Sequence, residues 1–146
     1  MSSATARTHN DQNPAFRFDS STVEWGDFFT DGTFYRILNV DLAAGTADMI
    51  VKFAPNSQCM YHRHAATTQT LVLQGELRVR EPVGGEGEIH IEGSGDEEAI
   101  IFFGMRTDTD VIYELLNEDL TLRRAVTVAD FDRDWRARWP GDTAAS

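Results

Sequence analysis

Two histidines separated by one residue are the strongest chemical signal in the sequence. His62 and His64 lie in the segment "CMYHRH" (59–64), and the 146-residue chain has only four histidines. If this segment is a β-strand, both imidazoles project from one face together with Met60, because residues i and i+2 share a face. Neutral imidazole is a common ligand of divalent metal ions. The pair therefore predicts a shared metal site, with two solvent-facing histidines as the alternative.

A third ligand would complete such a site. A metal-dependent oxygenase needs three protein ligands on one face and open positions for oxygen and substrate. Gln69 could be the third ligand, through its amide oxygen, and it shares strand parity with Leu71 and Leu73, which is consistent with an inward face. Glu97 and Glu98, just before the segment "AIIFF", are further carboxylate candidates. An amide carries no net charge, so Gln69 would bind a metal more weakly than a carboxylate would.

Other residues on inward faces are predicted to line a small-molecule pocket. Thr107 and Tyr113 share parity with Val111 and Leu115, which make the more apolar face of their segment. The predicted pocket residues are Met60, Leu71, Leu73, Thr107 and Tyr113. No catalytic residue is predicted.

The histidine of "EIHIE" (88–92) is predicted to face solvent. His90 is flanked by Ile89 and Ile91, so it shares its strand face with Glu88 and Glu92. A face that carries two carboxylates is typical of a solvated surface.

Short apolar segments alternate with turns along most of the chain, which favours a β-sandwich or barrel. Six of the eleven glycines lie from Gly75 to Gly95, so segment 82–96 is predicted to be a loop-rich hairpin. The predicted strands are 33–40, 46–53, 59–64, 70–74, 76–81, 99–103, 109–116 and 120–128, with a hairpin turn at 41–45.

One helix is predicted near the C-terminal end, at 129–139. Phe131, Trp135 and Trp139 stand four residues apart and form one apolar stripe. This stripe would cover one end of the barrel, or alternatively contact a second subunit. The polar residues 1–14 are predicted to be a disordered tail, so the domain organisation is a tail (1–14), a barrel (15–128) and a helix (129–140).

Composition limits the partners. The formal net charge of −11 argues against nucleic acid and anionic membranes, which attract basic surfaces. The sequence has no apolar run near the length of a membrane span and no secretory signal, so we expect a cytoplasmic protein. Sheet edges that need covering predict a homodimer.

The order of these features resembles the two signatures of the cupin superfamily. His62-x-His64 and the glycine of "LVLQGEL", Gly75, match the first signature, in which a Glu follows the second His by four or five residues. Thr68 or Gln69 stands in place of that Glu, depending on the spacing counted. Gly104 matches the glycine of the second signature, whose histidine would fall on Thr107. The resemblance covers about residues 30–128.

This resemblance implies an all-β, single-domain cupin, a double-stranded β-helix or jelly-roll barrel, here with a C-terminal helix. The small cupins that it resembles are acetylacetone-cleaving dioxygenases, dihydroxyacetophenone dioxygenases and the cupin domains of anti-sigma factors. The two dioxygenases use non-haem iron and the anti-sigma type binds zinc, so the expected cofactor is Fe(II), with zinc or nickel as alternatives.

The expected function is that of a metal-dependent dioxygenase acting on a small ketone, diketone or aromatic compound. His62, His64 and Gln69 would hold the metal. Because the family's third histidine is absent, the alternative is a non-catalytic cupin that binds or senses a small molecule or metal. A third alternative is a barrel that serves assembly only.

Overall fold

Short strands followed by one helix make up the described part of the chain. The computed structural model describes residues 23–81 and 89–138. The elements are β1 (Gly26–Asp27), β2 (Thr33–Asp41), β3 (Thr46–Phe53), β4 (His62–His64), β5 (Thr67–Gln74), β6 (Arg78–Arg80), β7 (Ile89–Gly93), β8 (Ala99–Arg106), β9 (Val111–Leu116), β10 (Leu122–Thr127) and α2 (Val128–Arg138).

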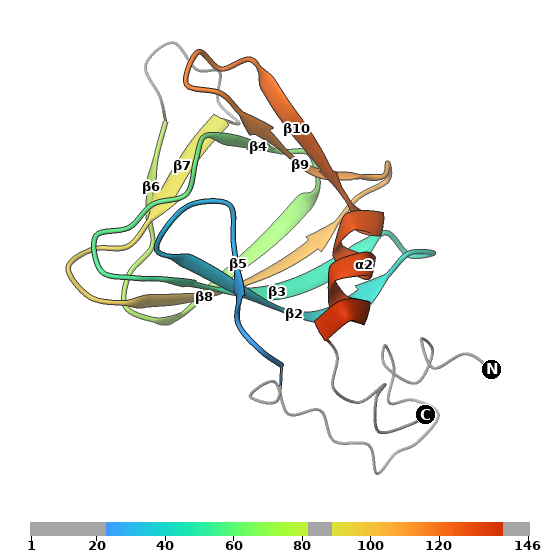
Figure 1. Cartoon of the computed structure of the whole chain (residues 1–146). Coiled ribbons are helices and arrows are strands. Elements are labelled where there is room, and N and C mark those ends of the chain that lie inside the picture. Colours follow the sequence, from blue (N-terminus) through green and yellow to red (C-terminus); the bar gives the residue numbers. More distant parts are fainter. Residues whose placement is uncertain (1–22, 82–88, 139–146) are drawn as a thin grey trace.

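The strands form two five-stranded sheets with the orders β1-β2-β3-β8-β5 and β10-β9-β4-β7-β6. Neighbouring strands are antiparallel throughout the described residues. The two sheets face each other, and α2 packs beside β2 at one end (Figure 1). This arrangement is the double-sheet jelly roll of the cupins, so the predicted all-β class with a C-terminal helix is confirmed.

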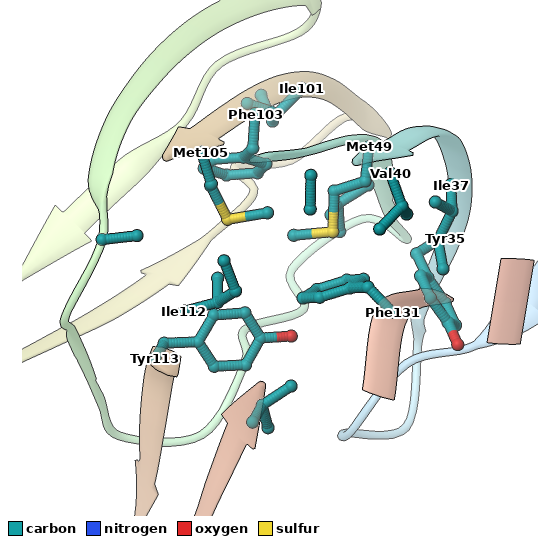
Figure 2. Packing of buried hydrophobic residues seen from close by; sticks show 14 of the residues in the cluster. Tyr35, Ile37, Val40, Met49, Ile101, Phe103, Met105, Ile112, Tyr113 and Phe131 are labelled. Atoms are coloured by element: carbon teal, nitrogen blue, oxygen red, sulfur yellow. The ribbon is translucent and has the colours of Figure 1, made fainter. Parts of the chain in front are cut away.

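Alternation of side chains along the long strands builds the core. In β3 every second residue is buried, and β8 shows the same pattern. Met49 and Val51 of β3 pack beside Ile101 and Phe103 of the neighbouring strand β8, on the face of the sheet that points into the core. Figure 2 shows Met49, Ile101 and Phe103. Each such side chain contributes roughly 1.5–3 kcal/mol when it leaves water. In β3 and β8 the apolar alternation in the sequence therefore specifies which face of the strand lies inside.

The turn after β5 requires glycine. Gly75 has a φ of 71°, in the left-handed region, and a Cβ added there would lie 2.5 Å from the Glu98 carbonyl oxygen. Only glycine tolerates both conditions without strain. This is the glycine that matched the first cupin signature.

Strand ends differ from the predicted ones. The strand predicted at 70–74 begins at Thr67, and the one predicted at 99–103 continues to Arg106. Residues 1–14 and 82–88 lie outside the described residues, as does Trp139 of the predicted helix stripe.

The helix begins with a reciprocal cap. The Thr127 hydroxyl accepts a hydrogen bond from the Asp130 amide at 3.2 Å, and the Asp130 carboxylate accepts one from the Thr127 amide at 2.9 Å. Val128, Phe131 and Trp135 are buried. The Tyr35 hydroxyl of β2 donates to Asp134 at 2.8 Å, which ties the helix to the first sheet. The described residues contain no helix that is long and apolar enough to cross a bilayer.

We expect Trp135→Ala to lower the free energy of unfolding by about 3–5 kcal/mol, because it empties a fully packed site between helix and sheet. Trp135 is only 1% exposed. Chemical denaturation measures the change. The control is Arg136→Ala, which removes an exposed ion pair with Asp132 and should cost less than about 1 kcal/mol. A loss below about 1 kcal/mol for Trp135→Ala would contradict this packing.

A homodimer remains a prediction, and the structure offers one edge for it. Strand β5 ends its sheet, carries no charged residue in a chain of net charge −11, and exposes Leu71 and Leu73 at 58% and 52%. An uncharged apolar edge is a template for pairing with another copy. Light scattering should give the mass of two chains, and Leu71→Lys should give one. Leu122→Lys, at an exposed leucine elsewhere, should leave the dimer intact. A monomeric wild type at micromolar concentration would refute the prediction.

Candidate metal centre

The short strand β4 carries both histidines into the barrel. It lies between β9 and β7, where His62 pairs with Leu115 and His90, and His64 pairs with Tyr113. The side chain of His62 is buried and that of His64 partly buried. The predicted sharing of one strand face brings the rings to 4.8 Å between centroids.

A carboxylate from β7 completes the cluster. Glu92 is only 6% exposed, and its Oε1 atom lies 2.7 Å from His62 Nε2 and 3.0 Å from His64 Nε2. The two Nε2 atoms are 3.1 Å apart. Among the described residues, these three side chains form the one group of histidine, cysteine and acidic residues able to hold a metal ion.

Hydrogen bonds on the far side of each ring decide which nitrogen faces the cluster. His62 Nδ1 lies 2.9 Å from the Met60 carbonyl oxygen, which can only accept, so Nδ1 carries a proton. The Thr68 hydroxyl donates to the Ala66 carbonyl at 3.1 Å and therefore accepts from His64 Nδ1 at 3.2 Å. In the neutral rings, both Nε2 lone pairs thus point toward Glu92, the tautomers that bind metal.

The three ligand atoms lie close enough together to bind one metal ion. Ligand bonds of about 2.1 Å place neighbouring ligand atoms about 3.0–3.4 Å apart, depending on the coordination angle. The observed separations are 2.7, 3.0 and 3.1 Å. Two imidazoles and one carboxylate on one face leave the remaining positions open, the arrangement typical of non-haem Fe(II) oxygenases. The residues therefore fit a divalent metal, although they do not decide which one.

The charges in the cluster imply that metal binding would displace a proton from His62. Burial alone would lower the pKa of His62, but hydrogen bonds and charge from Cys59 and Glu92 raise it to about 10. Burial alone would raise the pKa of Glu92, but hydrogen bonds from His62 and His64 lower it to about 2. Without a cation, His62 is therefore protonated and balances Glu92, and a bound metal must displace that proton.

Strand β5 meets the site through the face opposite to the predicted one. Because Thr68 bonds to His64, alternation sends Gln69, Leu71 and Leu73 to the outer face, where they are exposed. This corrects Gln69 as third ligand and removes both leucines from the pocket. Parity grouped these residues properly, but the pairing of β5 with β8 decided which group faces inward. Thr68, one of the two residues that match the position of the family's glutamate, orients His64 instead.

Of the remaining predicted pocket residues, two line a cavity beside the histidines and one does not. Met60 and Tyr113 line an inner cavity beside the histidines. Thr107 is buried elsewhere, with its hydroxyl 3.1 Å from that of Thr109, and does not line this cavity. Glu97 and Glu98 lie outside the metal cluster.

Sequence reasoning missed Glu92 because it assigned the His90–Glu92 face to solvent. Strand β7 lies beside β4 in the middle of the sheet, and its charged face is the inner one. His90 lies near the cluster, with its ring centroid 6.0 Å from that of His64. The signal in the sequence was the His-x-Glu spacing itself, which places two ligand types on one strand face.

Two hollows meet at the metal centre. The inner cavity, of about 30 Å³, is lined mainly by apolar side chains, including Phe28, Phe29, Met49, Phe53, Met60 and Phe103. The outer cleft, of about 580 Å³, opens to solvent and is lined by Thr68, Thr70, Val79 and His90 among others. His64 and Glu92 line both hollows, so a metal held by them would lie between the cleft and the cavity.

Tyr113 is the buried phenol of the inner cavity. Its side chain is 4% exposed, and its ring centroid lies 6.3 Å from that of His62 and 6.5 Å from that of His64. Burial raises its pKa well above the ordinary value, so the hydroxyl is neutral.

The jelly roll and the inward histidine pair define a cupin with a candidate metal site. Residues 13–105 match the family model described as the ChrR cupin-like domain. The chain therefore belongs to the ChrR cupin-like domain family. No curated protein matches the sequence closely enough to count as a relative.

Solved structures show the same fold at low sequence identity. An RmlC-like cupin protein of Ralstonia eutropha JMP134 is 12% identical, with a TM-score of 0.66 over 82% of this chain and 83% of the other. An acetylacetone dioxygenase of Acinetobacter johnsonii is 13% identical, with a TM-score of 0.67 over 84% and 91%. A putative acetylacetone dioxygenase of Methylibium petroleiphilum PM1 is 14% identical, with a TM-score of 0.61 over 82% and 93%.

The shifted pKa values of His62 and Glu92 predict how the stability of the metal-free protein depends on pH. Because the pKa of His62 is raised, its stabilisation is complete below the ordinary value of 6.5 and is lost as pH rises through about 10. Because the pKa of Glu92 is lowered, its stabilisation is complete above 4.5 and is lost as pH falls through about 2. The metal-free protein should therefore gain most from this pair between these ordinary values.

The affinity of the protein for a metal ion should instead rise with pH. Between pH 7 and 9 each bound ion should release about one proton, so affinity should rise about tenfold per pH unit. Calorimetry with zinc in buffers of different ionisation enthalpy measures the proton count. An affinity that does not change with pH would contradict the assignment of the displaced proton to His62.

Proposed function

We propose that this protein is a metal-dependent dioxygenase that acts on a small ketone or diketone. The observation that carries the proposal is the convergence of two imidazole nitrogens and one carboxylate oxygen at the wall of a largely apolar cavity. Two imidazoles and one carboxylate suit Fe(II), the expected metal, and zinc or nickel are the alternatives. The likeness to acetylacetone dioxygenases agrees with the proposal.

The chain's own residues have separable tasks. His62, His64 and Glu92 would hold the metal, while the Met60 carbonyl and the Thr68 hydroxyl fix the two ring tautomers. Bound Fe(II) would supply the redox chemistry with molecular oxygen. The phenylalanines of the inner cavity exclude bulk water from the substrate.

Cavity size favours the smallest of the expected substrates. One water needs roughly 10–15 Å³ by the same kind of measure, and the inner cavity provides about 30 Å³. The inner cavity therefore has room for about two water-sized groups, so even a small ketone or diketone would require its side chains to move, and an aromatic ketone would require larger movements.

Oxygen consumption tests the proposal. Protein reconstituted anaerobically with Fe(II) should consume oxygen when acetylacetone or 2-butanone is added. Glu92→Ala should lower metal affinity and turnover by at least about 100-fold, since a ligand matters more than the groups that orient it. Glu98→Ala, a carboxylate outside the cluster, is the matched control and should retain both. Iron-loaded wild type that consumes no oxygen above free iron would overturn the enzymatic proposal.

The second candidate is a non-catalytic cupin that binds or senses a metal or small molecule. It is favoured by the family match and by Thr107, which stands where the cupin signature has its third histidine. Stable metal binding without oxygen consumption would support it. The cytoplasmic location and the homodimer remain predictions.

A further inference from the structure

His90 is a histidine that lies beside the metal cluster but outside it. On β7 it is the direct cross-strand partner of His62 and stands two residues before Glu92, so these three side chains share one face of the sheet. Its ring centroid lies 6.5 Å from that of His62 and 6.0 Å from that of His64. In the described part of the chain the ring makes no hydrogen bond, so its nitrogens are available to a ligand.

The ring of His90 is too far away to bind the metal directly in this structure. The rings of His62 and His64, whose Nε2 atoms converge, are only 4.8 Å apart between centroids. Among the described residues, the ligand atoms that lie within 4.8 Å of one another do not include a nitrogen of His90. A ligand atom on the metal would lie about 2.1 Å from the ion and accept hydrogen bonds of about 2.8 Å. The position of His90 therefore suits a hydrogen bond to an atom on the metal better than a bond to the metal.

The outer cleft connects His90 with the metal centre and with solvent. Its wall includes His90, His64 and Glu92, with Thr70 of β5 and Val79 of β6. The cleft provides about 580 Å³, whereas the inner cavity provides about 30 Å³. A small molecule can therefore enter the cleft without moving side chains. Because His64 and Glu92 line both hollows, a metal between them would have an open position toward the cleft.

We propose that His90 donates a hydrogen bond to a small anionic or oxygen-donor ligand that binds the metal from the outer cleft. A neutral histidine always has one N–H donor and a protonated one has two, so this bond requires no change of protonation. The metal would bind one atom of the ligand while His90 holds the ligand from the cleft wall. This inference deepens the proposed function by adding a ligand-binding residue, and it rests on that function only for the presence of the metal.

Azide binding to cobalt-loaded protein tests the inference without turnover. Titrations at one fixed pH, followed by the visible absorption of Co(II), give the dissociation constant of azide. His90→Ala should raise this constant about tenfold, the effect of one good hydrogen bond. At least one of His90→Gln and His90→Asn should restore most of the affinity, because their amides place a donor near the position of Nε2 or Nδ1. The affinity for cobalt and the spectrum without azide should stay unchanged in His90→Ala.

Two tryptophan variants on neighbouring residues of β5 test the direction from which the ligand arrives. Thr70 lines the outer cleft, so Thr70→Trp should raise the dissociation constant of azide at least about fivefold by occupying that space. Gln69 is exposed on the other face of the same strand. Gln69→Trp adds the same bulk there and should bind azide as wild type does.

Several outcomes would overturn the inference. These are wild type that binds cobalt but no azide, an unchanged azide constant in His90→Ala, and equal azide binding by Thr70→Trp and Gln69→Trp. A cobalt affinity that falls about 100-fold in His90→Ala would also overturn it, because His90 would then be a metal ligand itself. Wild type that binds no cobalt would refute both this inference and the metal centre. Azide binding that depends on His90, in a protein that consumes no oxygen with iron, would contradict the proposed function alone.

Discussion

Two imidazole lone pairs and a carboxylate oxygen cannot share one small volume inside a protein unless positive charge lies between them. In this chain that constraint applies to His62, His64 and Glu92, whose ligand atoms all lie within 3.1 Å of one another. A proton on His62 satisfies it in the metal-free protein, and a divalent cation satisfies it better because three ligand atoms then bind one centre. The exchange of one for the other would make metal binding at this candidate site sensitive to pH.

The fold can be understood as the frame that maintains this arrangement. Strand β4 is only three residues long, so it depends on β7 and β9 for its position. The same neighbours contribute Glu92 and Tyr113. The apolar core between β3 and β8 supplies the wall of the inner cavity, and Thr68 on β5 orients His64 from the opposite sheet. Each sheet thus contributes both packing and chemistry.

The site also differs from the family signatures in an informative way. Thr68 or Gln69 stands at the signature position of the glutamate, and Thr107 stands at that of the third histidine. The carboxylate comes instead from Glu92, on a strand that the signatures do not include as a ligand source. A ligand set that seems incomplete along the sequence is therefore complete in space. The inner cavity beside this cluster is lined mainly by apolar side chains.

The sequence by itself determined the two-sheet class, the strand alternation, the C-terminal helix and the shared face of His62 and His64, because these follow from periodicities of two and 3.6 residues. It grouped Gln69 with Leu71 and Leu73, and His90 with Glu92, but parity alone cannot say which group faces inward. Tertiary pairing decided that, with β5 placed beside β8 and β7 beside β4. Glu92 was then buried against the histidines and Gln69 was left in solvent, since the inner face of a strand is set by its neighbours in the sheet rather than by its own residues.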